Sequence, residues 1–323
     1  MPAETRLGEF ELIAALFAPL AAPGAFGLTD DAAVLSPPGG GDVVMTKDMM
    51  VAGVHFLEED PPDLIARKLL RVNLSDLAAM GARPFGYALG LSLPPGIDDA
   101  WLREFAAGLA ADQREFDVLL LGGDTTSTPG PLTLSLTAFG AAATGRVLRR
   151  TGASLGDAVF VSGTIGDAAL GLLALRGEVD DPGNYLAGRY RLPQPRIALG
   201  AALTDTASAG LDVSDGLVAD LGHLCRASGV GAEIDVERIP LSDAARAIID
   251  ADPEKIDLIL GGGDDYELVF TVPPKRIGHI EREASSLGVP VTRIGRIVAG
   301  EGVHVLDTSG REIMPRLSGY RHR

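Results

Sequence analysis

The chain has 323 residues, of which 46% are hydrophobic and 22% are charged. This length suits two domains better than one, and the composition is that of a globular protein and excludes a disordered one. The formal net charge of -16 disfavours nonspecific attraction to nucleic acid or to an anionic membrane.

Cys225 is the only cysteine, which excludes a disulfide framework and a cysteine-based metal site. It falls in an apolar run with helical spacing, so we expect it in the core. The first nine residues carry acidic and basic side chains, unlike a signal peptide. The apolar run 12–22 is interrupted by Pro19 and is too short to span a bilayer. We therefore expect a cytoplasmic protein.

Hydrophobic spacing predicts alternating helices and strands in the first half of the chain. Asp98-Asp99 should cap a helix in which Trp101, Phe105 and Leu109 form one apolar face. Helices are expected over 9–20, from 61 to about 73 and from 98 onward, and strands over 42–46 (ending at Lys47-Asp48), 85–93, 117–121 and 132–139.

The basic, glycine-containing stretch 145–156 marks the boundary between two domains, 1–145 and 146–323. A loop rich in Asp, Pro and Gly is expected after 175. The second half should hold strands over 158–162, 232–236 and 266–272, helices over 166–175, from Pro195, 217–227, 243–250 and 274–287, and two or three short strands at the end. This alternation predicts an α/β protein with mixed α+β character in two domains.

The stretch 73–81 is apolar and helix-compatible except at Asn73, Ser75 and Asp76. Asn73 and Asp76 are three residues apart, so on a helix their side chains point to one side. A carboxylate in such a segment is costly to bury unless a cation or several donors meet it. Two interpretations stay open: Ser75 or Asp76 caps a helix, or Asp76 binds a cation while Ser75 caps.

Five further motifs place an aspartate beside glycine, serine or threonine. They are T-D-D at 29–31, T-K-D at 46–48, G-G-D at 122–124, D-V-S-D-G at 212–216 and G-G-D-D at 262–265. The two halves echo each other, because 48 positions lead from Asp76 to Asp124 and 49 lead from Asp215 to Asp264. A diverged duplication and chance would both explain this spacing.

Aspartate oxygens combined with threonine and serine hydroxyls suit hard cations such as Mg²⁺. Paired acids such as Asp30-Asp31 repel one another, so their clustering makes sense only with cations between them. With several divalent ions bound, an acidic site attracts a nucleoside triphosphate and can neutralise charge during phosphoryl transfer. No G-x-x-x-x-G-K-[ST] phosphate loop and no kinase H-R-D or D-F-G set occurs. Direct in-line transfer organised by metal ions therefore fits better than a covalent nucleophile.

These motifs together resemble the thiamine-monophosphate kinase family, whose superfamily also holds aminoimidazole ribonucleotide synthetase and selenophosphate synthetase. The matching segments cover nearly the whole chain in the family's order. They are 8–13, 51–56, 73–81, 122–126, 212–217 and 265–268. The stretch 73–81 and the segment around His55 separate this family from its superfamily relatives.

The resemblance implies a PurM-like architecture that transfers the ATP γ-phosphate onto thiamine monophosphate, giving thiamine diphosphate. It also implies an N-terminal domain that binds ATP and metal and pairs across a homodimer, a larger C-terminal α/β domain, and sites between them. By family pattern, Mg²⁺ ions would be held by Asp31, Thr46, Asp48, Asp76, Asp124, Asp212 and Asp215. ATP would contact Gly123, Asp124, Arg150 and Ser214, and the thiamine substrate would face His55, Asp264 and Leu317.

Three residues depart from the family pattern. Lys47 stands where a small hydroxyl residue is expected, and it would replace a metal's charge, reach a phosphate or point outward. Asp264 stands where glutamate is frequent, so the substrate contact would be shorter. Leu317 stands where an aromatic ring would stack on the substrate, with Tyr320 nearby.

Two other functions remain open at this point. One is a superfamily relative that makes an acyl-phosphate or iminophosphate intermediate from ATP. The other is a noncatalytic regulator that binds a nucleotide or thiamine without turnover. Considered alone, His55 would be an ordinary partly buried histidine and Arg149-Arg150 a solvated pair.

Overall fold

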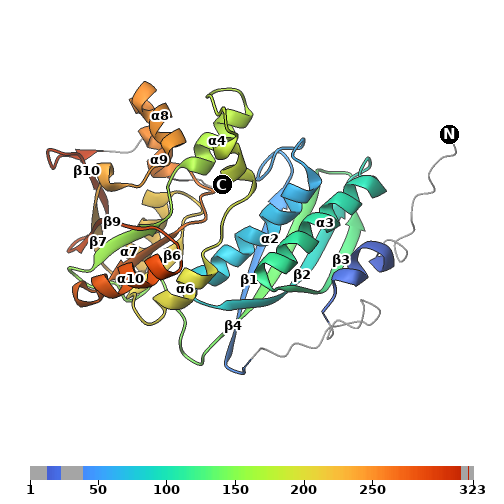
Figure 1. The fold of residues 1–323 in the computed structure, drawn as a ribbon, viewed down its shortest axis with the longest axis horizontal. Helices are drawn as coiled ribbons and strands as arrows, with labels where there is room; N and C mark the ends of the chain where they lie inside the picture. Colours follow the sequence, from blue (N-terminus) through green and yellow to red (C-terminus); the bar gives the residue numbers. More distant parts are fainter. Residues whose placement is uncertain (1–12, 23–38, 314–318, 320–323) are drawn as a thin grey trace. The chain divides into compact units, whose positions relative to one another are not determined.

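The computed structural model describes residues 13–22, 39–313 and 319 (Figure 1). The expected site residues Asp31 and Leu317, together with Tyr320, lie outside the described residues. The chain divides into two compact units, one made of 1–77 with 83–145 and the other of 78–82 with 146–323. In the described part of the chain, no helix has both the length and the apolar character that a bilayer crossing requires.

The N-terminal unit is built on a four-stranded sheet with the order β1-β4-β2-β3. β4 runs antiparallel to both of its neighbours, whereas β2 and β3 run parallel. This order leaves β1 and β3 at opposite edges of the sheet. The strands are β1 (Asp42–Val51), β2 (Arg83–Leu93), β3 (Leu119–Ser127) and β4 (Thr133–Ala142).

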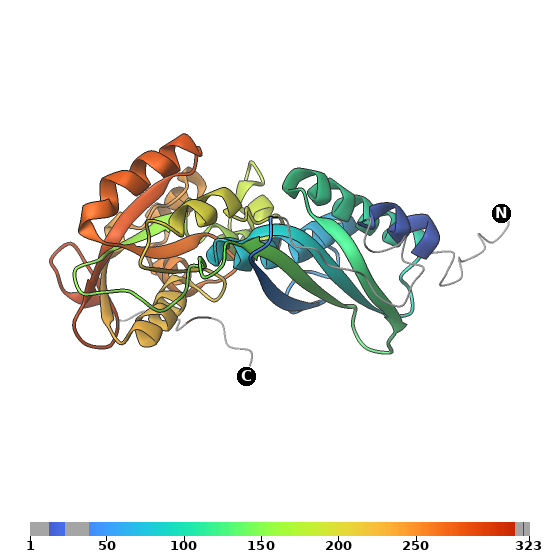
Figure 2. The same ribbon diagram turned by 90° about the horizontal axis from the view of Figure 1, so that it is seen from below.

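Two long helices, α2 (Pro62–Ala79) and α3 (Asp99–Phe116), cover one face of this sheet (Figure 2). Burial alternates along β4, as the sequence predicts for a strand with one covered face. Asp98 caps α3, because its carboxylate accepts a hydrogen bond from the Trp101 backbone N–H at 2.8 Å, which confirms the predicted cap. The described part of the expected N-terminal helix is helical, as a π-helix, η1 (Ile13–Phe17), followed by a 3-10 helix, η2 (Ala18–Leu20).

A buried ion pair joins α2 to α3. Arg71 is 1% exposed and donates from Nε and Nη2 to the two carboxylate oxygens of Asp112 at 2.7 and 2.9 Å. Arg67 donates to the same carboxylate at 2.8 Å, and Glu115 accepts from Arg71 at 2.6 Å. Because a two-pronged pair is directional, it fixes the rotation of α2 and with it the stretch 73–81.

Three predictions about this unit are wrong. β1 does not end at Lys47-Asp48 but continues past it, and β3 runs through 122–124 instead of ending before it. α2 continues to its end at Ala79, so Ser75 and Asp76 lie inside the helix and neither residue caps a helix N-terminus. In each case polar side chains inside a helix or strand resemble the polar residues that normally mark its end.

The C-terminal unit contains a seven-stranded mixed sheet with the order β11-β10-β7-β9-β5-β8-β6. Only β10 and β7 are parallel neighbours among the described strands of this sheet. The strands are β5 (Ala158–Ser162), β6 (Ala209–Asp212), β7 (Gly231–Asp235), β8 (Leu268–Val272), β9 (Val291–Val298), β10 (Gly302–Leu306) and β11 (Glu312–Ile313).

Helices cover both faces of this sheet, so β5 and β8 are buried along their whole lengths. On one face Val159 and Val161 pack in a cluster with residues of α4, α7, α8 and α9. On the other face Phe160 and Phe270 stack at 5.7 Å and pack against α6 and α10. The α-helices are α4 (Asp167–Leu175), α5 (Tyr185–Arg191), α6 (Ile197–Leu203), α7 (Leu217–Ser228), α8 (Asp243–Ala251), α9 (Ile256–Gly261) and α10 (Ile277–Ser286), and the 3-10 turns are η4 (Val236–Arg238), η5 (Pro253–Lys255) and η6 (Pro274–Arg276).

The core position of Cys225 is confirmed, since it is buried in α7. The expected loop after residue 175 contains the helix α5, and Pro195 precedes α6 without opening it. The three strands β9 to β11 confirm the short strands expected near the C-terminus. The two units together confirm the mixed α/β class.

Candidate active site

Thr46, Asp48, Asn73 and Asp76 lie together between β1 and α2, and we call them the helix-facing cluster. Thr46 Oγ1 donates to Asp76 Oδ2 at 2.5 Å, and the Asp48 backbone N–H donates to Asn73 Oδ1 at 3.2 Å. Because β1 is an edge strand, its outward N–H groups need partners outside the sheet. The three-residue spacing in α2 therefore brings Asn73 and Asp76 to β1 side by side.

The electrostatics of this cluster favour a cation. Burial, followed by repulsion from Asp76, raises the pKa of Asp48 from 3.8 to about 7, and the charge of Lys47 opposes that rise. A divalent cation between the two carboxylates would remove their repulsion and compensate the burial. The donors are carboxylate, hydroxyl and amide oxygens, which are the ligands that Mg²⁺ takes in proteins. The cluster therefore fits Mg²⁺.

Lys47 does not belong to the cluster. Strand alternation puts its side chain on the sheet face opposite to Thr46 and Asp48. There it is exposed, and its Nζ donates to Ser135 Oγ. Of the three interpretations that the sequence leaves open for Lys47, this geometry supports the outward-pointing one.

Asp124 lies at the other edge of the same sheet. It pairs with Gly90 of β2, which pairs with Ser135 of β4, and both Asp124 and Gly123 are exposed. Three strand spacings separate β1 from β3, which is about 14 Å. The register also places Asp124 on the open face of the sheet, whereas Asp48 faces the helices. One Mg²⁺ holds its ligands at about 2.1 Å, so Asp124 and the helix-facing cluster of one protomer cannot share an ion.

His55 follows β1 and is held at both its ring and its backbone. Its Nδ1 accepts a hydrogen bond from the Val51 backbone N–H at 3.1 Å. Because a backbone N–H can only donate, the neutral ring carries its proton on Nε2. Lys68, which is 3% exposed, donates to the His55 carbonyl at 3.1 Å. The half-buried imidazole is thereby oriented with Nε2–H as a donor, which suits an oxygen-rich substrate group.

In the C-terminal unit, the loop after β6 and the loop after α9 are hydrogen-bonded to each other. The Asp264 N–H donates to the Ser214 carbonyl at 2.9 Å, and the Val213 N–H donates to the Glu267 carbonyl at 2.8 Å. Gly263 permits this approach, since a Cβ there would lie 2.2 Å from the Ser214 carbonyl oxygen. The expected ATP contact and the expected substrate contact thus lie on touching loops.

Both loops carry acidic residues, and the backbone of the loop after α9 is strained. Asp264 and Tyr266 have φ values of 72° and 50°, in the left-handed region that is unfavourable for residues with a Cβ. The Tyr266 hydroxyl donates to Asp264 Oδ1 at 3.3 Å. Asp212 is buried at the end of β6, and Asp215 is half-buried in the following loop. Strained backbone of this kind is concentrated at functional sites.

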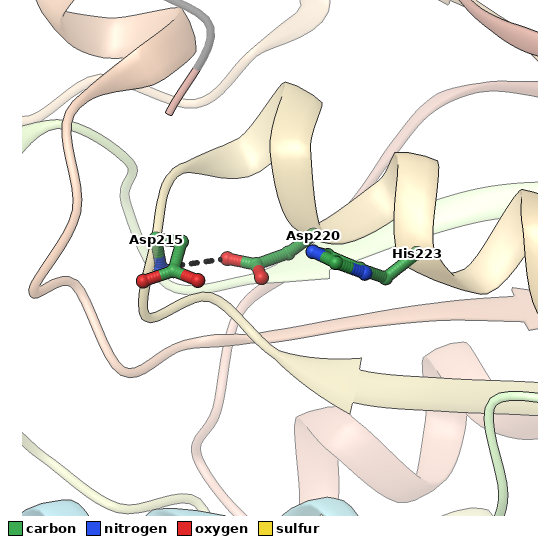
Figure 3. A group of neighbouring side chains, drawn as sticks. All are labelled: Asp215, Asp220 and His223. Atoms are coloured by element: carbon green, nitrogen blue, oxygen red, sulfur yellow. Dashed lines mark hydrogen bonds between the residues drawn. The ribbon is translucent and has the colours of Figure 1, made fainter. Parts of the chain in front are cut away.

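Sequence analysis missed Asp220, in the first turn of α7. Its Oδ2 accepts hydrogen bonds from three consecutive backbone N–H groups, those of Ser214, Asp215 and Gly216, at 3.0, 2.9 and 3.1 Å. Figure 3 shows the Asp215 contact. Burial raises the pKa of Asp220 to about 7, and the backbone donors oppose that rise. The sequence did contain a signal for this contact. Asp220 lies one helical turn after Gly216, and a glycine at the start of a helix has no side chain to cap it.

His223 lies beside this loop (Figure 3). One of its ring nitrogens and the carboxylate oxygens of Asp215 and Asp220 lie within 4.8 Å of one another. Arg226 Nη2 lies 2.9 Å from His223 Nδ1. Arginine can only donate, so Nδ1 accepts and the proton is on Nε2. Burial, together with the charges of Arg226 and Arg150, lowers the pKa of His223. The ring is therefore neutral, with Nδ1 engaged by Arg226. Arg150 lies near the same loop.

Glu267 is a second residue that sequence analysis did not single out. Its buried carboxylate accepts two hydrogen bonds from Arg196 at 2.7 and 2.6 Å, one from Arg189 at 2.8 Å and one from Ser162 Oγ at 2.6 Å. It thereby fixes α5 and the start of α6 against the start of β8. The arginines are 71 and 78 positions away in sequence, so no local pattern predicts the contact.

The segment 152–156 fits a G-x-S-x-G pattern but not the geometry of a nucleophile. A nucleophile elbow follows a strand and opens a helix, whereas this segment precedes β5. The Ser154 backbone N–H donates to Asp157 Oδ2 at 3.0 Å, and its hydroxyl lies 3.5 Å from the Gly152 carbonyl. The serine belongs to a turn.

The two units correspond to the two domains of one protein class. The N-terminal domain of the AIR synthase related proteins matches residues 29–142, and the C-terminal domain matches residues 155–307. A solved structure of the hydrogenase maturation protein HypE in complex with ATP has the same fold, with a TM-score of 0.79 at 20% identity over 95% of this chain and 94% of that chain. Fold and acidic clusters thus define a two-domain protein of the AIR synthase related class.

Closer relatives narrow this class. The chain is 48% identical to the thiamine-monophosphate kinase of Caulobacter vibrioides, over 99% of this chain and 92% of the relative, and 42% identical to that of Salmonella typhimurium, over 98% of each. The crystal structure of the Stenotrophomonas maltophilia thiamine-monophosphate kinase gives a TM-score of 0.81 at 44% identity, covering 88% of this chain and 91% of that one. AaThiL complexed with AMPPCP and TMP gives 0.77 at 32% identity, covering 99% and 100%. The chain belongs to the thiamine-monophosphate kinase family, which confirms the family expected from the sequence.

Proposed function

We propose that the reaction of this family, phosphorylation of thiamine monophosphate with ATP, proceeds on this chain by direct in-line transfer assisted by several Mg²⁺ ions. The observation that carries the metal requirement is the raised pKa of Asp48, which burial and the charge of Asp76 lift to about 7, in a cluster whose hydrogen bonds join β1 to α2. Direct transfer is supported by the state of Cys225, since burial raises the pKa of its thiol to about 11, and by the turn position of Ser154.

The residues divide into three groups by role. When bound, Mg²⁺ would neutralise phosphate charge that the carboxylates alone would repel. The Nε2–H of His55 would donate to the substrate, and Asp264 would accept from it. The proposed metal ligands are Asp31, Thr46, Asp48, Asp76, Asp124, Asp212 and Asp215, and the proposed ATP contacts are Gly123, Asp124, Arg150 and Ser214.

The test is an assay of the purified protein with ATP, Mg²⁺ and thiamine monophosphate that follows thiamine diphosphate. We expect product from thiamine monophosphate and none from unphosphorylated thiamine. Asp76→Asn should lower turnover at least about 100-fold, because it removes a carboxylate that would bind and neutralise the cation. Glu104→Gln, which changes an exposed residue, should not lower turnover. Ligand-induced thermal stabilisation without product would show a binding regulator, and product formed equally from thiamine would contradict the substrate assignment.

We also propose that the N-terminal unit pairs with a second copy through the open face of its sheet. On β1, Val43, Met45 and Met49 are 47%, 65% and 54% exposed, and Leu119 on β3 is 39% exposed. Large apolar side chains that are exposed at both edges of one sheet face are typical of a protein interface; the exposed Lys47 and Asp124 share this face. Met45→Asp should therefore give monomers in size-exclusion chromatography with light scattering, whereas Val54→Asp, at an equally exposed position outside the sheet, should not.

Pairing would also explain the position of Asp124. Within one protomer Asp124 is about 14 Å across the sheet from the helix-facing cluster, and it lies on the face that we propose to be the interface. The helix-facing cluster lies at the β1 edge of the sheet, so if the partner's sheet reaches that edge, a complete ligand set would take Asp76 from one protomer and Asp124 from its partner.

Mixed dimers test this sharing. Asp76→Asn and Asp124→Asn homodimers should each be inactive. A mixed dimer would contain one site with both changes and one with neither, so random mixing should restore about a quarter of wild-type activity. No recovery after dissociation and reassociation would mean that each site belongs to one protomer.

A further inference from the structure

We infer that Asp220 is a positioning residue, whose carboxylate fills the anion-binding concavity at the start of α7 and so makes the preceding loop present side chains instead of backbone N–H groups. The inference rests on the proposed function, because it concerns how Ser214 and Asp215 would meet the nucleotide and its cations. It does not assign Asp220 a contact with either.

The geometry begins with the entry to α7. Gly216 stands at the N-cap with φ 120° and ψ 146°, and no side chain caps the helix from that position. Three successive N–H groups, of Ser214, Asp215 and Gly216, converge on Asp220 Oδ2 within 3.1 Å. Successive backbone N–H groups that point into one concavity form an anion site, and in many nucleotide-binding loops a phosphate occupies it. Here a carboxylate of the chain itself, 3% exposed, occupies it.

This arrangement holds the loop from two sides. Asp220 accepts hydrogen bonds from the N–H groups of the loop, and the Asp264 N–H donates to the Ser214 carbonyl oxygen at 2.9 Å. With its backbone donors engaged, the loop can meet an anion only through its side chains or through ions held by them. The fixed loop would present Asp215 to a cation without first paying the entropy of ordering the loop.

The competing interpretation is that Asp220 is itself a metal ligand, since its carboxylate, that of Asp215 and a ring nitrogen of His223 lie within 4.8 Å of one another (Figure 3). Two observations argue against it. Asp220 is 3% exposed and its Oδ2 already accepts three hydrogen bonds, and Arg226 already engages His223 Nδ1. The two interpretations predict different results for Asp220→Asn. Asparagine keeps an oxygen that can accept the three backbone hydrogen bonds, but it is a poor metal ligand.

The experiment counts Mn²⁺ ions by electron paramagnetic resonance in the presence of a non-hydrolysable ATP analogue, and measures the Mg²⁺ concentration that half-saturates turnover. Asp215→Asn should lose one bound ion. Asp220→Asn should keep the wild-type count with nearly unchanged half-saturation, and Asp220→Ala should keep the count but raise the half-saturating Mg²⁺ at least about tenfold, as loss of a residue that orients a ligand does.

Two results would overturn the inference. Loss of one ion in Asp220→Asn would make Asp220 a ligand, and a lower melting temperature in Asp220→Ala with unchanged metal and analogue affinities would make it only structural. If the alanine variant does not fold, Asp220→Ser replaces it, because a shorter hydroxyl cannot reach all three donors and should give an intermediate shift. Ion counting needs no turnover, so it decides the role of Asp220 even if wild-type protein forms no thiamine diphosphate.

Discussion

Replacing Asp48 with asparagine should make the metal-free protein more stable at about pH 8, although Asp48 belongs to the proposed active site. The folded protein keeps this carboxyl protonated up to about pH 7, because burial and the nearby charge of Asp76 oppose its ionisation. Above that pH the folded state must hold an uncompensated charge. Asparagine has the same shape and no charge, so it removes this cost.

The sign and size follow from proton linkage. The unfolded chain loses this proton near pH 3.8 and the folded chain near about 7. Between these values the folded state binds one proton more than the unfolded state, so stability falls as the pH rises and the loss is complete above about 7. A difference of about 3 pKa units corresponds to about 4 kcal/mol. Because water reaches the half-buried Asp48, we expect about 2 kcal/mol.

The assay is urea unfolding in EDTA, followed by circular dichroism between about pH 5 and about pH 8. The gain from Asp48→Asn should be largest at the alkaline end and shrink as the pH falls. Saturating Mg²⁺ should reverse the order, because wild type gains a bound ion that the variant lacks. Glu104→Gln, which removes an exposed carboxylate from the same unit, serves as the control. A variant less stable than wild type in alkaline EDTA, or a gain equal at both ends of the range, would refute the reasoning.

Two further predictions concern the buried ion pairs. Gly163→Ala should lower the free energy of unfolding in urea by at least about 2 kcal/mol, because its φ is +56° and a Cβ there would lie 2.2 Å from Glu267 Oε1. Gly177→Ala is the control for the backbone cost alone, since Gly177 has a φ of +73° and nothing within 4 Å of an added Cβ. Equal losses of stability in the two variants would rule out the clash. Asp112→Asn should destabilise by about 3 kcal/mol, because it removes the charge paired with the buried guanidinium of Arg71. Glu115→Gln, in the same network but 44% exposed, should cost under about 1 kcal/mol, and similar losses in both variants would contradict this account.

The regular elements could be predicted where burial alone shapes the sequence. β4 shows one covered face through its alternation, and β5 and β8 show two covered faces through continuous apolar runs. The errors in predicting these elements occur where polar side chains of the proposed site stand inside a helix or strand. Asp48 points to the covered face of its strand and Asp76 lies inside a helix, so both break the apolar pattern that would have placed them correctly.

The site itself could be predicted in residue type but not in position. Nearly equal spacing, 48 residues from Asp76 to Asp124 and 49 from Asp215 to Asp264, leads to opposite arrangements. In the C-terminal unit the second acid lies on a loop that hydrogen-bonds directly to the loop of the first. In the N-terminal unit the strand order sends the second acid to the far edge of the sheet, about 14 Å away. Sequence separation fixes neither strand order nor partner, and for that reason we propose that Asp76 and Asp124 meet between two copies of the chain.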